Sequence, residues 1–126
     1  MKPEGGKRFA FFTVLFLAYI LFFPAPSGAH AFPDHSEPEV GGTVAGSIGS
    51  VRIWFDSDLE PLFSKIVVKN SGGQQVDKGD SHVDPSKDSL LIVSVPPLPP
   101  GTYHVYWSVV ARDTHRTEGD FTFTVK

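Results

Sequence analysis

The sequence predicts an all-β domain, a single two-sheet β-sandwich or Greek-key β-barrel, preceded by a segment for export. First, no stretch after Phe23 repeats its apolar residues with the period of a helix. Second, short runs of alternating apolar residues recur between turns rich in Gly, Pro, Asn and Asp. Third, 13% aromatic residues and eleven prolines suit a small β-rich fold better than a helical one. With 126 residues the chain suffices for one core, and it contains no internal repeat.

Residues 1–29 have the composition of a signal peptide. Three basic residues among the first eight precede an apolar run over residues 9–23, which is short for a membrane span of about 20 residues. Small residues at 27–29 then form a cleavage site. We expect cleavage after Ala29, so that His30 begins a mature domain of residues 30–126. A cut after Ala31 and an uncleaved anchor are the alternatives.

The first half of the mature domain is predicted to hold few strands. Residues 30–49 are rich in Pro, Gly, Ser and Glu, and we expect an extended lead-in with turns there. Residues 51–55 alternate apolar and polar side chains, as a half-buried strand does. A turn at 56–61 separates them from a short β-branched strand at 66–68, which ends at the turn Asn70-Ser71-Gly72-Gly73.

The second half carries the stronger strand patterns. Residues 74–87 are polar, with a weak strand expected around Val76, and a buried strand is expected at 89–95. The connector at 96–101 contains four prolines and cannot lie inside a sheet. Two long strands follow. Their expected inward residues are Tyr103, Val105, Trp107 and Val109 in one, and Phe121, Phe123 and Val125 in the other.

Charge and composition exclude several classes of function. The net charge is −3, and removal of residues 1–29 takes away three basic residues and one acidic residue, which leaves −5. An acidic domain without a basic patch argues against nucleic-acid binding. The absence of cysteine excludes disulfides, thiolate metal sites and cysteine nucleophiles. No phosphate-binding loop, Ser–His–Asp arrangement or paired-carboxylate motif is present.

Asp113-Thr114-His115 lies between the two strongest strand patterns. If the strand persists through it, Asp113 and His115 point to the same side, because side chains alternate with period two. A carboxylate and an imidazole suit a divalent transition metal, although two ligands are too few for a tight site. The alternative is structural: Asp113 caps a turn and His115 is solvated.

An N-terminal histidine completes such a site. The free amine and the ring Nδ1 of His30 can chelate one metal ion, His115 adds a third nitrogen, and Asp113 adds an oxygen. Three nitrogens and one oxygen suit one Cu(II) ion in a tetragonal arrangement. The only methionine is Met1, so the mature domain has no soft ligands for a Cu(I) site.

At these residues the chain resembles the CopC family of periplasmic copper-binding, copper-resistance proteins, over essentially all of residues 30–126. The similarity is carried by His30-Ala31, by Ser36-Glu37-Pro38-Glu39-Val40-Gly41 (the family's Ser-x-Pro-x-x-Gly), by Val51-Arg52-Ile53-Trp54-Phe55, by the segment from Gly101-Thr102-Tyr103-His104 to Val110, by Asp113-Thr114-His115, and by Gly119 and Phe121-Thr122-Phe123.

The resemblance implies a Greek-key β-barrel of about seven strands, cupredoxin-like in outline. It implies that His30, Asp113 and His115 match the family's Cu(II) ligands. It also implies a monomeric, periplasmic or otherwise extracytoplasmic copper carrier that is not an enzyme. Members are often linked to a CopD-type membrane protein, which would be the transfer partner.

The chain departs from the family at several positions. The Met- and His-rich segment that binds Cu(I) in some members has no counterpart, and His82 lies in the corresponding region without methionines. Arg116 replaces the proline that often follows the Asp-x-His motif. His35 does not belong to the family pattern, and we expect it to be a solvated loop residue or a supplementary ligand. His104 is expected to be structural. Arg112 and Glu118 flank the motif as candidate contacts of the ligands.

Two other functions stay open at this stage. A copper-dependent redox enzyme with an N-terminal histidine, like the polysaccharide monooxygenases, would use a similar ligand set, but no flat aromatic substrate surface is recognisable. A metal-free immunoglobulin-like interaction module is favoured if cleavage falls after Ala31 or does not occur.

Overall fold

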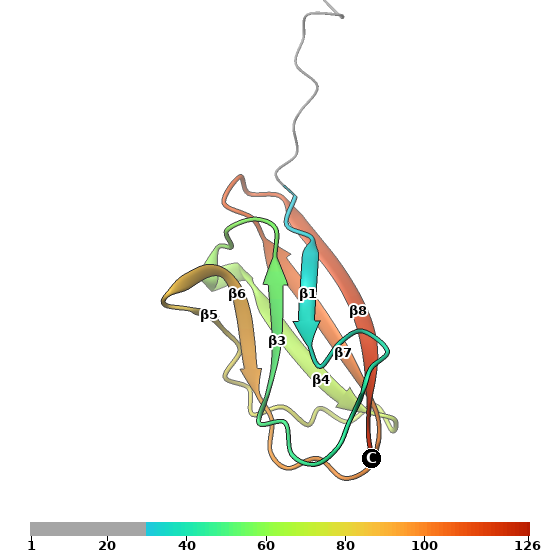
Figure 1. Cartoon of the computed structure of the whole chain (residues 1–126). Helices are drawn as coiled ribbons and strands as arrows, with labels where there is room; N and C mark the ends of the chain where they lie inside the picture. Colours follow the sequence, from blue (N-terminus) through green and yellow to red (C-terminus); the bar gives the residue numbers. More distant parts are fainter. Residues whose placement is uncertain (1–29) are drawn as a thin grey trace, which may run out of the picture.

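The computed structural model describes residues 30–126, which form a sandwich of two four-stranded sheets (Figure 1). The predicted signal peptide, residues 1–29, lies outside the described residues. The two-sheet, nearly all-β architecture confirms the predicted fold class, as a sandwich rather than a closed barrel. Within residues 30–126, no helix is long and apolar enough to cross a membrane.

The first sheet has the strand order β1-β3-β6-β5, with every neighbouring pair antiparallel. Its strands are β1 (Pro33–Glu37), β3 (Ser50–Phe55), β6 (Lys87–Ser94) and β5 (His82–Asp84). The register between β1 and β3 shifts between Pro33 and His35, which is a β-bulge near the start of the described chain.

The second sheet has the order β2-β8-β7-β4. Its strands are β2 (Thr43–Val44), β8 (Arg116–Val125), β7 (Gly101–Val110) and β4 (Lys65–Asn70), and a single 3-10 turn, η1 (Pro61–Phe63), precedes β4. Strands β7 and β8 form an antiparallel hairpin of ten residue pairs, from Gly101 opposite Val125 to Val110 opposite Arg116. The short β2 runs parallel to the C-terminal end of β8.

The core lies between the sheets and contains the side chains that the alternation predicts. Val51, Ile53 and Phe55 of β3 are buried, and Phe121, Phe123 and Val125 of β8 face them from the other sheet. The inward residues of β7 belong to the same core cluster; they are Tyr103, Val105, Trp107 and Val109. Burial of these apolar side chains is the main stabilising term, at roughly 25 cal/mol per Å² of apolar area.

Two predictions about the weaker strands are wrong. Residues 30–49 are more than a lead-in, since they contain β1 and β2. The strand expected around Val76 lies instead at His82–Asp84, and Gln75 forms only an isolated bridge with Lys69. Both segments are polar because they border solvent, so their alternation is too weak to mark them in the sequence.

The polar segment after β4 protects the edge of that strand. The hydroxyl oxygen of Ser81 accepts the Ile66 N–H at 2.8 Å, and Asp77 Oδ2 accepts the Val68 N–H at 2.8 Å. Side-chain oxygens therefore occupy backbone donors that would otherwise be open to another strand. The loop therefore covers the free edge of β4, as a further strand would.

Gly119 leaves room for the Trp107 indole, because it has no side chain. The two residues are opposite each other in the β7–β8 register. A Cβ atom at Gly119 would lie 2.7 Å from Trp107 Cε2, which is closer than a real contact allows. The indole, only 8% exposed, packs edge-on against Phe55 with ring centroids 5.4 Å apart.

We therefore predict that Gly119→Ala destabilises the domain by about 1–3 kcal/mol, since overpacking forces the indole out of its position. Urea unfolding followed by tryptophan fluorescence measures this loss. Gly72→Ala is the matched control, because a Cβ there has only Asn70 Oδ1 within reach, at 3.4 Å. Equal midpoints for both variants would contradict the prediction.

Candidate metal centre

The Asp113-Thr114-His115 motif forms the tight turn that joins β7 to β8. The Ala111 N–H donates to the His115 carbonyl at 3.0 Å, and the Thr114 N–H donates to the Ala111 carbonyl at 2.8 Å. Thr114 has a φ of 73°, in the left-handed region that non-glycine residues rarely occupy. The turn is therefore closed by its own backbone bonds, on top of a ten-residue hairpin.

Asp113 and His115 lie together, but not for the reason that the alternation suggested. The strand does not persist through the motif, because β7 ends at Val110 and β8 begins at Arg116. The turn brings the two side chains together instead, with His115 Nδ1 3.2 Å from Asp113 Oδ2. The prediction of proximity is right and its mechanism is wrong.

The Asp113 carboxylate is also the cap of this turn. Its Oδ1 accepts the backbone N–H of His115 at 3.2 Å. This bond is the main reason that the pKa of Asp113 lies below its ordinary value, and the His115 and His30 rings lower the pKa further. The two carboxylate oxygens therefore have different partners: Oδ1 caps the turn, and Oδ2 faces His115 Nδ1.

The described chain begins beside this turn, at the same end of the sandwich (top of Figure 1). The His30 ring meets the His115 ring edge-on, with centroids 4.8 Å apart. The structure therefore places the three predicted ligands at one end of the sandwich. His30 is at least 83 positions away from Asp113 and His115 in the sequence.

His30 Nδ1 is a buried polar atom without a hydrogen-bond partner among residues 30–126. Such atoms are rare in folded proteins, and each one needs a physical explanation. The sequence singles out this same atom as the chelating nitrogen of an N-terminal histidine.

The three side chains do not by themselves form a finished metal cage. Among residues 30–126, no three His, Asp or Glu side chains converge tightly enough to hold a metal ion. His115 Nδ1 points at Asp113, so that at most one of its ring nitrogens faces His30. A metal would need a further donor, or a small rotation of the exposed His115 ring.

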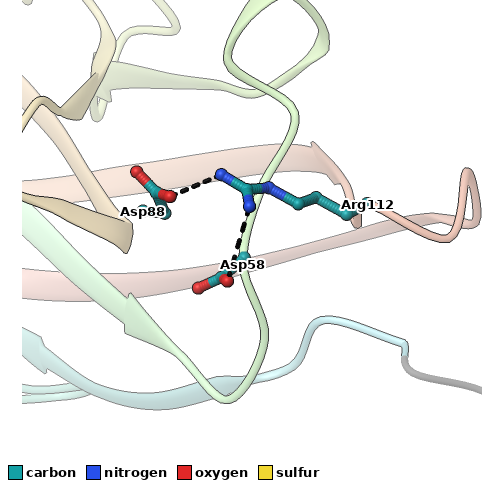
Figure 2. A network of polar contacts seen from close by, with 3 residues as sticks. All are labelled: Asp58, Asp88 and Arg112. Atoms are coloured by element: carbon teal, nitrogen blue, oxygen red, sulfur yellow. Dashed lines mark hydrogen bonds and ion pairs between the residues drawn. The ribbon is translucent and has the colours of Figure 1, made fainter.

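Arg112 does not contact the ligands, contrary to one expectation. Its guanidinium forms ion pairs with Asp88 and, at 3.8 Å, with Asp58, as Figure 2 shows. These contacts tie the β7–β8 turn to the first sheet. Glu118 is exposed and lies opposite Ser108 in the β7–β8 register, three positions beyond His115.

The remaining histidines have partners of their own. The His35 ring stacks on Trp54 at 4.3 Å and lies 3.8 Å from the Asp34 carboxylate. His82 Nδ1 is 2.8 Å from the Asp80 carbonyl oxygen. The His104 ring stacks on Tyr106 at 4.3 Å and pairs with Asp120, which supports the structural role expected for it.

Comparison with known proteins defines the class of this β-sandwich. The family model of the CopC domain matches residues 34–126. Copper resistance protein C of Escherichia coli is 32% identical over 105 residues, which cover 78% of this chain and 82% of that protein. Copper transport protein CutJ of Bacillus subtilis is 27% identical over 113 residues, which are 89% of this chain but only 21% of CutJ.

Solved structures give the same result. CopC from Methylosinus trichosporium OB3b superposes with a TM-score of 0.69 at 32% identity, covering 77% of this chain and 94% of that one. PcoC, a methionine-rich copper resistance protein from Escherichia coli, gives 0.67 at 30% identity and covers 78% and 100%. The chain belongs to the CopC family. This is a family of copper resistance proteins rather than enzymes, as predicted.

We predict that Asp113 titrates below the ordinary aspartate pKa of about 3.9. A lowered folded-state pKa means that this carboxylate contributes stability above its unfolded pKa and loses it as the pH falls through the folded value. NMR titration of the metal-free protein measures the midpoint from the Asp113 carboxyl and from the His115 amide proton.

Asp113→Asn is the matched control, because its side-chain oxygen still accepts the His115 N–H but cannot titrate. In this variant the His115 amide should stop shifting in the acid range. An Asp113 midpoint at or above that of an ordinary aspartate would contradict the prediction.

Proposed function

We propose that the mature protein is an exported carrier that binds one Cu(II) ion outside the cytoplasm, to sequester it or to pass it on. His30 would supply its terminal amine and Nδ1, His115 a third nitrogen, and Asp113 an oxygen. The proposal rests first on membership of a family of copper resistance proteins.

The unpartnered Nδ1 of His30 is the observation that carries the ligand assignment. A buried nitrogen without a partner is unfavourable, and a bound metal would satisfy it. The nearby His115 ring and the ionised Asp113 carboxylate supply one more nitrogen and one oxygen. Nitrogen and oxygen donors without thiolate favour Cu(II), which also has the highest affinity among the common divalent metals.

The amine exists only if the signal peptide is removed after Ala29. Ala31 is completely buried in the core, and its carbonyl accepts a hydrogen bond from Thr117. A cut after Ala31 would remove a core residue together with His30. This cost supports the cut after Ala29.

The proposed partner is a larger copper transport protein of the CopD type at the membrane, and the proposed location is the periplasm or the equivalent extracytoplasmic space. The match to CutJ supports such a partner, because about four fifths of that copper transport protein lies outside the matching region.

We predict that protein beginning at His30 retains one Cu(II) per chain, and that His30→Ala weakens binding by more than about 100-fold. Losing a direct ligand should exceed the 10–100-fold effect typical of outer-shell residues. Titration against a Cu(II) chelator of known affinity, with native mass spectrometry for the terminus and stoichiometry, measures both quantities.

Protein beginning at Ser27 is the sharper control, since it keeps every side chain but moves the amine three residues away from His30. It should lose affinity to a similar extent. His104→Asn should leave the affinity unchanged, because His104 stacks on Tyr106 and pairs with Asp120, six residue pairs away from the turn. Equal binding by the His30 and Ser27 forms would refute the amine ligand.

We further predict that Cu(II) binding weakens as the pH falls. Both imidazoles, the amine and the carboxylate must be deprotonated to bind the metal, so protons compete with copper. The same competition titration repeated between neutral and mildly acidic pH measures this effect. Affinity that is constant over this range would argue against nitrogen ligands.

A further inference from the structure

Thr117 is a polar residue at a core-facing position of β8. The inward row of this strand runs through Gly119, Phe121 and Phe123, and Thr117 is the next member toward the turn. In the register it lies opposite the fully buried Val109. A hydroxyl at such a position needs a partner, and Thr117 Oγ1 donates to the Ala31 carbonyl oxygen at 2.6 Å.

Asp56 holds the next residue of the same segment from the other sheet. Its Oδ1 accepts the Phe32 N–H at 2.8 Å, and its own N–H donates to the Phe32 carbonyl oxygen at 3.0 Å. Asp56 directly follows β3 of the first sheet, whereas Thr117 belongs to the second. Thr117 and the Asp56 carboxylate therefore bind the C=O and the N–H of one peptide unit, Ala31–Phe32, from opposite layers.

Ala31 lies between these two contacts and is 0% exposed. Chain termini fray unless they are tied down, yet here the residue next to His30 is buried and hydrogen-bonded. Only the backbone of His30 itself separates this anchor from the ring that meets His115 at 4.8 Å. The reach of the terminal residue is thus set by residues 31 and 32.

We propose that Asp56 and Thr117 are positioning residues that form an N-terminal clamp on Ala31 and Phe32, and that this clamp sets the Cu(II) affinity. This inference rests on the proposed function. The clamp keeps the terminal histidine docked beside His115 before the metal arrives. The apparent dissociation constant rises in inverse proportion to the docked fraction, so a loosened clamp weakens binding without removing any ligand.

The first test is Thr117→Val, which removes the hydroxyl and keeps the shape. We expect Cu(II) affinity to fall about three- to tenfold, the range for one net hydrogen bond. Thr117→Ser retains the hydroxyl and should restore the affinity. Electron paramagnetic resonance at limiting copper should show the same bound nitrogens in Thr117→Val as in the wild type, since no ligand is removed, and urea unfolding should confirm that the fold is intact.

The second test combines this change with loss of the terminal ligand. In a His30→Ala protein that begins at Ser27, and so lacks both donors of residue 30, Thr117→Val should cause no further loss of affinity, because the clamp acts through residue 30. An equal loss in both backgrounds would overturn the proposal, since Thr117 would then act through the β7–β8 turn.

Asp56 supplies a matched pair of variants on the opposite sheet. Asp56→Asn keeps an oxygen that accepts the Phe32 N–H and should change the affinity little. Asp56→Ala removes the acceptor and should weaken binding as Thr117→Val does. If Asp56→Ala and Thr117→Val both bind Cu(II) as the wild type does, the clamp plays no part in affinity.

Amide hydrogen exchange of the metal-free protein separates this inference from the proposed function. The Phe32 amide should be protected in the wild type, and it should exchange faster in Asp56→Ala and in Thr117→Val. A wild type with protected Phe32 but no Cu(II) binding would refute the copper site and leave the docked segment standing. Rapid exchange of Phe32 in the wild type would refute the clamp itself.

Discussion

The register of the β7–β8 hairpin is the constraint on which the site depends. Ten consecutive pairs fix Val110 opposite Arg116, so the five residues between them must reverse the chain. That reversal forces Thr114 into the left-handed region and brings Asp113 against His115. A shift of one residue would send every apolar side chain of β8 to the solvent face, so the core stabilises the turn. The candidate metal centre is therefore built on the most extensively paired element of the fold.

The third proposed ligand, His30, comes from the other end of the described domain and is held differently. His30 precedes any strand, and its position depends on a few hydrogen bonds to residues 31 and 32 and on the burial of Ala31. The turn residues are thus fixed by the hairpin, whereas two of the four donors that we propose depend on these contacts of residues 31 and 32.

Family likeness and site geometry support different parts of the conclusion. The CopC match begins at residue 34, after the terminal segment, and so it establishes the fold and the class of protein without reaching His30. The ligand assignment rests instead on the buried Nδ1 of His30, which has no hydrogen-bond partner among residues 30–126. Among residues 30–126 no finished metal cage is present. The further donor that we propose is the free amine that removal of the predicted signal peptide would create.

The sequence by itself determined the sandwich, its strong strands and the three candidate ligands. Alternation marks strands such as Val51–Phe55 because their inward residues must be apolar, and the resemblance at Asp113 and His115 is local. Sequence reasoning missed β1, β2 and β5, whose edge positions leave little alternation. Only the tertiary structure decided that a turn unites Asp113 with His115, that Arg112 pairs elsewhere, and that Asp56 and Thr117 hold the start of the mature domain. These contacts join residues far apart in the chain, so no local pattern encodes them. The polar Thr117 on an otherwise apolar inward row was a signal in the sequence that this residue has a buried hydrogen-bond partner.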